Sequence, residues 1–209
     1  MASYNAIALP NVFGLILMVS LTWFACSSWR VAQPAWRDEL IQMMEHDQLA
    51  RQRLIEKGYD DIDSLDVAWV DSIDVANTKR LQQFIEEKGW PRKTQVGTKG
   101  VKAAFLIVQH ADHVFQKEML PLVQTAYEQG ELSGQELALL TDRVLVREGK
   151  PQRYGTQAIV SNGAVEFSPI EAERAVDERR AALGLMPLAQ YKKRLERMYR
   201  IKTSNTDER

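Results

Sequence analysis

The sequence predicts a mainly α protein: a single compact helical domain of about six helices with one small β-hairpin, preceded by an N-terminal hydrophobic anchor helix. Apolar residues recur at helical spacing through most of the chain. One Asn-Gly pair separates two short β-prone runs. No charged side chain precedes Arg30, although 26% of all residues are charged. The expected segments are an anchor or signal at 1–33, a helical domain at 34–201 with its hairpin near 155–168, and a flexible tail at 202–209.

Composition excludes some classes of protein. The 209 residues include 27 Lys and Arg against 28 Asp and Glu, which gives a net charge of −1. Nucleic-acid binders normally carry a basic excess, so we expect no nucleic-acid partner. The single cysteine, Cys26, excludes an internal disulfide framework and a cysteine-rich zinc site.

The amino-terminal segment predicts attachment to a membrane. Residues 12–29 form an apolar run near the minimum length of a spanning helix, and also suit the apolar part of a secretory signal. Cys26 follows a small residue, as in a lipoprotein leader, but Trp23 and Phe24 and the lack of early basic residues depart from that pattern. A buried helix of a soluble protein is the alternative. Arg30 favours a cytoplasmic carboxyl side, and the orientation stays open.

The first elements after the anchor are two helices. Helical spacing of apolar residues runs from Trp36 to Lys57, and Gly58 ends it. The acidic stretch 60–74 is expected to be a solvated loop with helix-capping aspartates. A second helix is expected from Asp74 or Asn77 to Lys88.

The middle of the chain predicts three more helices. Residues 101–111 are almost wholly apolar and predict a buried helix that Thr98 can cap. Asp112 can cap the next helix, and a capping box at 133–136 opens another. The hairpin follows around Asn162-Gly163. Helices are then expected at 171–183 and again after Pro187.

Polar residues on these apolar elements are the candidate site. A buried imidazole or carboxylate needs partners, and His110 ends the most apolar helix of this part. We predict that acid/base groups come from His110, Asp112 and Asp142, and that an arginine fork at Arg143 binds an anion. Residues expected to line the pocket are Gln109, Gln152, Tyr154 and Gln157.

An alternative interpretation needs no site. Asp142 pairs with an arginine, His110 is a hydrogen-bonded core residue, and the turn after Gly149 is a scaffold. A metal held by His110, Asp112 and His113 is conceivable, but no further histidine or cysteine lies nearby. No metal or cofactor is therefore expected. The motifs of nucleotide-binding loops, serine-hydrolase elbows and zinc peptidases do not occur.

A set of motifs resembles a known family. HDQLAR begins at His46, and GWP (89–91), QHAD (109–112), LTDRV (140–144) and QRYGTQ (152–157) follow in order. They resemble an uncharacterised family of bacterial proteins, a domain of unknown function often carried behind a signal peptide or lipoprotein leader. The resemblance adds Asp47 and Arg51 to the expected substrate-binding residues. A motif set so rich in polar residues implies a site, and the leader implies the bacterial cell envelope.

Three functions remain open at this point. The first is a membrane-attached enzyme, a hydrolase or transferase that uses the His/Asp/Arg pocket on a small polar or anionic substrate. The second is a non-catalytic, membrane-tethered module that binds such a ligand. The third is a structural or assembly subunit with protein partners at the membrane.

Overall fold

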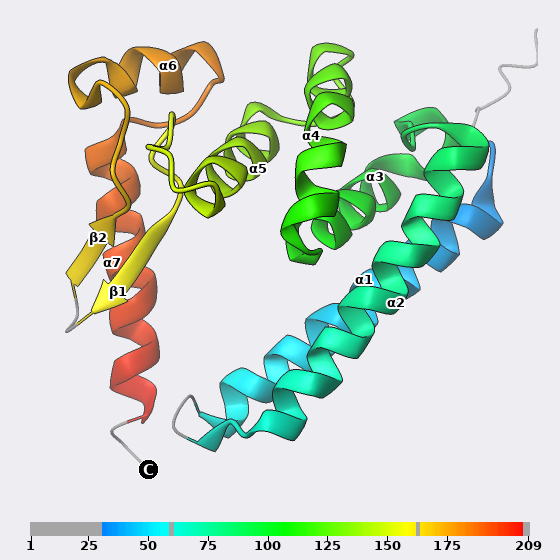
Figure 1. The fold of residues 1–209 in the computed structure, drawn as a ribbon, viewed down its shortest axis with the longest axis horizontal. Coiled ribbons are helices and arrows are strands. Elements are labelled where there is room, and N and C mark those ends of the chain that lie inside the picture. Colours follow the sequence, from blue (N-terminus) through cyan, green and yellow to red (C-terminus); the bar gives the residue numbers. More distant parts are fainter. Residues whose placement is uncertain (1–30, 59–60, 162–163, 207–209) are drawn as a thin grey trace, which may run out of the picture. The chain divides into compact units, whose positions relative to one another are not determined.

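The computed structural model describes residues 31–58, 61–161 and 164–206 of the chain. This part is mainly helical, with one two-stranded antiparallel sheet, as expected (Figure 1). The α-helices are α1 (Pro34–Lys57), α2 (Ser64–Lys88), α3 (Lys93–His110), α4 (His113–Glu128), α5 (Gly134–Arg147), α6 (Val176–Ala182) and α7 (Leu188–Thr206). The strands are β1 (Ala158–Ser161) and β2 (Ala164–Phe167), and a short 3-10 helix, Glu173–Ala175, precedes α6.

The expected anchor lies almost wholly outside the described residues. Residues 1–30, which include the apolar run 12–29 and Cys26, are not described. Among the residues that the structure does describe, no helix is long and apolar enough to cross a membrane.

Helices α1, α2 and α3 form the packing unit that carries the site. α1 begins at Pro34, whose missing N–H suits a first helical position, and it ends at Lys57, with Gly58 (φ +88°) as its C-cap. Its buried side chains, Trp36 and Leu40 among them, pack against α2 and α3. Trp36 meets Phe84 of α2 with ring centroids 5.3 Å apart.

The expectation of a loop over residues 60–74 was wrong for most of that stretch. α2 already begins at Ser64, so the aspartates at 66, 71 and 74 lie on a helix. The Asp63 carboxylate accepts hydrogen bonds from the N–H groups of Leu65 and Asp66, and the Asp66 carboxylate accepts one from the Asp63 N–H. This capping box, together with the burial of Val70, sustains a helix whose low intrinsic propensity suggested a loop.

Helix α3 brings His110 to the site. It begins at Lys93, earlier than expected, and breaks its regular geometry at Gly97, with φ +69°. The straight section after Gly97 contains the predicted buried helix, including Val101 and Val108, both almost inaccessible to solvent. Because α3 ends at His110, the imidazole lies where the buried helix meets the surface.

The predicted starts of α4 and α5 and the hairpin agree with the structure, whereas the helix expected from residue 171 begins as the 3-10 helix at Glu173 and becomes α-helical only at Val176. Asp112 caps α4 by accepting the Phe115 N–H at 2.8 Å, and Ser133 opens α5 in a capping box with Glu136. β1 and β2 pair in antiparallel register, with Ser161 opposite Ala164. The Asn-Gly turn between them lies outside the described residues. α7 continues to Thr206, into the segment expected to be a tail.

Candidate functional site

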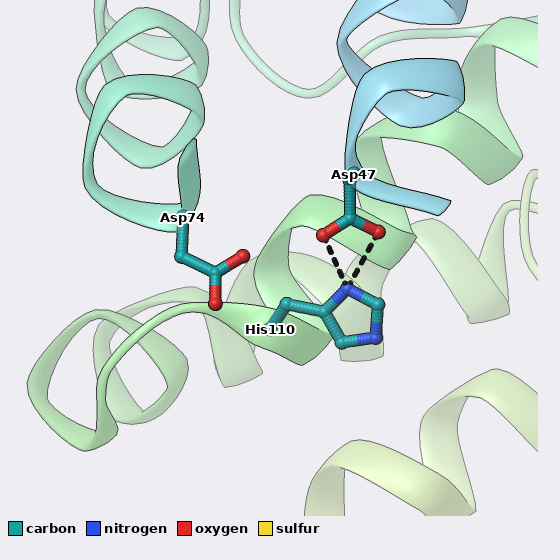
Figure 2. A group of neighbouring side chains, drawn as sticks. All are labelled: Asp47, Asp74 and His110. Carbon is teal, nitrogen blue, oxygen red and sulfur yellow. Dashed lines mark hydrogen bonds and ion pairs between the residues drawn. The ribbon is translucent and has the colours of Figure 1, made fainter. Parts of the chain in front are cut away.

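Four ionisable side chains from three helices meet at the carboxyl end of α3. Asp47 and Arg51 lie one turn apart on α1, Asp74 comes from α2, and His110 ends α3. Figure 2 shows Asp47 and Asp74 approaching the imidazole from different helices. Asp47 is the most buried of the four, with 3% of its side chain exposed, whereas His110 keeps 20%. The cluster therefore joins a buried carboxylate to a partly accessible imidazole.

Asp47 and His110 form a carboxylate–imidazole pair. Both carboxylate oxygens of Asp47 lie 2.9 Å from Nδ1 of His110. A carboxylate only accepts hydrogen bonds when ionised, so the pair requires the proton on Nδ1. The second ring nitrogen, Nε2, points away from Asp47 (Figure 2). In neutral His110, this arrangement gives Nε2 the lone pair, which is the state of a general base or a metal ligand.

Arg51 connects the two carboxylates. Its Nη2 donates to both oxygens of Asp74, at 2.6 and 2.8 Å, and its Nε donates to Asp47 Oδ1 at 3.1 Å. Nε also lies 3.0 Å from His110 Nδ1. With Nδ1 protonated toward Asp47, the Nε–H donates to the carboxylate and not to the ring. One guanidinium thus balances two partly buried negative charges.

The surroundings shift the two carboxyl groups in opposite directions. Burial by itself raises the pKa of Asp47, but the hydrogen bond and charge of His110 and the charge of Arg51 outweigh it, so the net pKa is lowered. Burial also raises the pKa of Asp74, and there the Arg51 contacts do not overcome it. Asp47 therefore keeps its negative charge to a lower pH than Asp74.

The same cluster has the donor types of a metal site. Ligand atoms of Asp47, Asp74 and His110 all lie within 4.8 Å of one another. Carboxylate oxygens with one imidazole suit Zn²⁺ or Mn²⁺. However, Arg51 hydrogen-bonds both carboxylates and approaches the ring nitrogen, so its guanidinium already supplies the positive charge at their centre. The residues fit an internal ion-pair network better than a metal centre.

A cavity of about 530 Å³ opens beside the imidazole. His110, Ala111 and Asp112 line it from the end of α3, and Arg147 lines it from α5. The α2 residues that complete its wall include Asp71, Asp74 and Lys79. Its volume falls within the range of small-molecule sites. A partly exposed imidazole therefore faces a space large enough for a small polar ligand.

Arg147 has no carboxylate partner in the part of the chain that the structure describes. Its Nη1 contacts only neutral acceptors, the Gln116 side chain at 3.1 Å and the Ala111 carbonyl at 3.4 Å. Arg143 likewise donates only to the Gln109 carbonyl, at 2.6 Å. Burial lowers the pKa of Arg143, and repulsion from Arg147 and Arg51 lowers it further. Two arginines without a carboxylate partner among the described residues thus lie at this end of α3, and one of them, Arg147, lines the cavity.

Three of the predicted site residues join this region in different roles. Asp112 lines the cavity, but its carboxylate also caps α4 and its residue is exposed. Gln109 is buried, its carbonyl binds Arg143 and Gln116, and its side-chain nitrogen has no partner among the described residues. Arg143 donates to the Gln109 carbonyl and so anchors the end of α3.

Asp142 belongs to a separate network. Its side chain is fully buried and accepts backbone N–H groups from Arg153, Tyr154 and Thr156 at 2.8 to 3.0 Å. A carboxylate saturated in this way holds the 152–157 turn in place. The structure does not bring it into contact with His110, so its predicted catalytic role gains no support from the geometry.

The glutamines of the turn support the same scaffold. Gln152 is fully buried, and its amide bonds the Gln157 backbone and the Ser168 carbonyl. Gln157 reaches the Leu139 carbonyl and the Thr156 hydroxyl. The Tyr154 carbonyl accepts Nη1 of Arg180. These predicted substrate-binding residues fix the turn and the hairpin and do not line the His110 cavity.

Sequence reasoning missed two members of the site. Asp74 was considered only as the last residue of the acidic stretch and a possible first residue of the second helix, although it lies four residues before Thr78 and seven before Leu81 on the same helix. Arg147 follows the LTDRV block by one helical turn and was passed over. If the residues of α2 and α5 are placed on helical wheels, the faces that carry Asp74 and Arg147 can be recognised from the sequence alone.

Comparison with known proteins identifies a family but no function. A family model described as a family of unknown function, DUF6624, matches residues 34–204. No curated protein and no solved structure matches the chain. The match covers all the elements that carry the site.

Proposed function

This chain belongs to the DUF6624 family of unknown function, and we propose that it is an enzyme, a hydrolase or transferase, that acts on a small polar substrate with an anionic group. His110 is the general acid/base, and the substrate occupies the cavity of about 530 Å³ beside it. The observation that carries the proposal is the Asp47–His110 pair at the cavity wall.

Asp47 acts through His110 as a positioning residue. Its buried carboxylate fixes the Nδ1–H tautomer and stabilises the imidazolium that forms when Nε2 accepts a proton. The lowered pKa of Asp47 keeps this carboxylate ionised through the neutral range. Arg51 Nε also donates to Asp47 Oδ1, at 3.1 Å, and limits the rotation of this carboxylate. A preoriented base of this kind contributes typically about 10²–10⁴-fold to rate.

Arg147 supports the choice of an anionic substrate group. It lines the same cavity as His110, and its described contacts are neutral oxygens. A guanidinium fork without a carboxylate partner favours a carboxylate or phosphate oxygen. The α2 wall, with Asp71 and Asp74, adds negative charge opposite, so the polar remainder of the substrate meets hydrogen-bond acceptors there.

We further propose that residues 12–29 attach the protein to a membrane of the bacterial cell envelope. The apolar run and the absence of charge before Arg30 support this location. The orientation of the domain relative to the membrane is left open.

The test compares wild type with His110→Gln on three panels of anionic substrates: phosphate monoesters, carboxylate esters and amides. We expect turnover in one panel, a loss of at least about 100-fold in kcat for the variant, and a change in unfolding free energy within about 1–2 kcal/mol. His46→Gln is the matched control, because His46 is exposed and lies away from this cavity.

Equal turnover by wild type and His110→Gln would contradict the acid/base role. The second function, a non-catalytic binding module, predicts another result. In that case no panel is turned over, but inorganic phosphate binds to wild type and binds less tightly to Arg147→Met. Loss of folding in His110→Gln would instead support a purely structural network.

A further inference from the structure

A second cavity, of about 330 Å³, lies between α5, the α6–α7 connection and α7. It shares no lining residue with the His110 cavity. Its walls include the buried guanidinium of Arg180, and Arg194 lines it from α7. Neither arginine has a role in the proposed acid/base chemistry, so this cavity needs a separate explanation.

Arg180 is the largest fully buried side chain in the described part of the chain, with 2% exposure. Its Nε donates to the Met186 carbonyl at 2.7 Å, and its Nη1 donates to the Tyr154 carbonyl at 2.5 Å. The guanidinium also lies 5.0 Å from the centre of the Tyr191 ring. These contacts fix its position but supply no negative charge.

No ion pair to Arg180 occurs among the residues that the structure describes. Burial lowers the pKa of Arg180, whereas Tyr191, Asp177 and Asp142 act in the opposite direction, and both carboxylates also accept hydrogen bonds from backbone N–H groups. Asp142 accepts the backbone N–H groups of the 153–156 turn, and Asp177 accepts the Leu188 N–H at 2.7 Å. Arg180 donates to two backbone carbonyls and lies over the Tyr191 ring, and an anion in the cavity would lower the cost of burying its charge.

Besides the arginines, the cavity is lined by the polar side chains of Gln135, Thr156 and Tyr191 and by a group of apolar side chains. The apolar group consists of Leu139 of α5, Leu185 and Met186 after α6, and Leu195 and Met198 of α7. No Asp or Glu is among its lining residues. Positive charge at one part of the cavity and aliphatic and thioether groups elsewhere match a ligand with an anionic head and an apolar tail.

We infer that this cavity binds a small carboxylate with an apolar tail of medium length, the carboxylate on Arg180 and Arg194 and the tail along Met186 and Met198. The planar guanidinium fork matches the carboxylate, and the volume of about 330 Å³ is at the lower end of small-molecule sites. This inference is independent of the proposed enzyme function, since the two cavities share no residue.

The test uses the full chain labelled with ¹³C in its methionine methyl groups. Octanoate is the probe, octan-1-ol has the same tail without charge, and acetate has the charge without the tail. Met186 and Met198 line the cavity, so we expect octanoate to shift their methyl signals. The signals of Met43 and Met119 should not change, since both side chains are buried elsewhere. Octanol and acetate should bind at least about tenfold more weakly.

Variants separate the roles of the arginines. Arg194→Gln should weaken octanoate binding about tenfold and leave octanol binding unchanged, because it removes one charge-assisted contact. Arg197→Gln, on the same helix and outside the cavity, is the matched control and should bind like wild type. Arg180→Lys keeps the charge but loses the fork, and should also weaken octanoate.

Two results would overturn the inference. The first is equal binding of octanoate and octanol at the Met186 and Met198 signals, since it would show that the arginines do not recognise the charge. The second is the absence of any shift at these signals at millimolar octanoate in wild type. Both measurements use the unmodified chain, so neither depends on whether a variant folds.

Discussion

Nδ1 of His110 lies 2.9 Å from both carboxylate oxygens of Asp47, although 63 positions separate the two residues in sequence. The contact joins α1 to the end of α3 and leaves Nε2 directed away from Asp47 (Figure 2). Catalytic and metal-binding histidines are commonly oriented by such a second group. The relationship therefore yields a prediction that needs no substrate.

Asp47→Asn should change the tautomer of His110. In wild type, ¹⁵N NMR at about pH 8, where an ordinary imidazole is neutral, should show a protonated Nδ1 and an unprotonated Nε2. In the variant, the Asn amide can either accept a hydrogen bond from Nδ1–H or donate one to an unprotonated Nδ1, so both tautomers should be populated. Asp38→Asn, an exposed change on the same helix, is the control. An unprotonated Nδ1 in wild type would show that Arg51 Nε donates to the ring instead.

Arg51→Ala should convert the cluster into a divalent metal site. Removal of the guanidinium leaves Asp47, Asp74 and His110 with donor atoms within 4.8 Å of one another and no cation among them. Calorimetry should then detect one Zn²⁺ per chain in the variant and none at this site in wild type. Without metal, the free energy of unfolding of the variant should be about 3–5 kcal/mol lower than that of wild type, because a partly buried ion pair loses one partner.

Arg53→Ala provides the matched control for this experiment. Arg53 lies on the same helix, and its guanidinium lies 5.5 Å from the centre of the Trp69 ring, outside the cluster. It should neither bind Zn²⁺ nor lose comparable stability. Zinc binding by wild type that requires Asp47 would contradict the view that Arg51 replaces the metal.

The sequence predicted where the helices and strands lie along the chain better than which helices pack against each other. Capping residues such as Asp112 and Ser133 and the buried run of α3 act locally, so their roles were readable from neighbours in sequence. The prediction of a loop over the acidic stretch was wrong because aspartate has low helix propensity, and the packing of Val70 that offsets this propensity is a tertiary effect.

The candidate site was only partly predictable for a related reason. Asp47, Arg51 and His110 were all named, but nothing local indicates that α1 packs against the end of α3. Asp142 and His110 were expected to act together because both are polar residues on apolar helices. The structure separates them, since backbone N–H groups of the 153–156 turn occupy the Asp142 carboxylate.

Asp142→Asn should destabilise the protein far more than Asp112→Asn. The Asp142 carboxylate accepts three backbone N–H groups in a fully buried position, and an amide would turn a donor toward one of them. The expected loss is about 2–4 kcal/mol. Asn is as good a helix cap as Asp, so Asp112→Asn should change stability by less than about 0.5 kcal/mol. Urea unfolding measures both, and similar losses would contradict a scaffold role confined to Asp142.

The two carboxylates that contact Arg51 should affect acid stability with opposite signs. The pKa of Asp47 is lowered from 3.8 in the folded protein, so its ionised form favours folding. That stability is present above the unfolded pKa and is lost as the pH falls through the lower folded pKa. The pKa of Asp74 is raised from 3.8, so its contribution is present below the unfolded pKa and is lost as the pH rises through the higher folded pKa.

Unfolding free energies of wild type, Asp47→Asn and Asp74→Asn, measured by urea from about pH 2 to pH 6, should therefore diverge. Asp47→Asn should lose less stability than wild type as the pH falls below the unfolded value, because its acid-sensitive group is gone. Asp74→Asn should lose more over the acid range, because it lacks the group that favours the folded state on protonation. Parallel curves for all three proteins would mean that burial and Arg51 do not separate the two carboxyl groups, and that the cluster titrates as one unit.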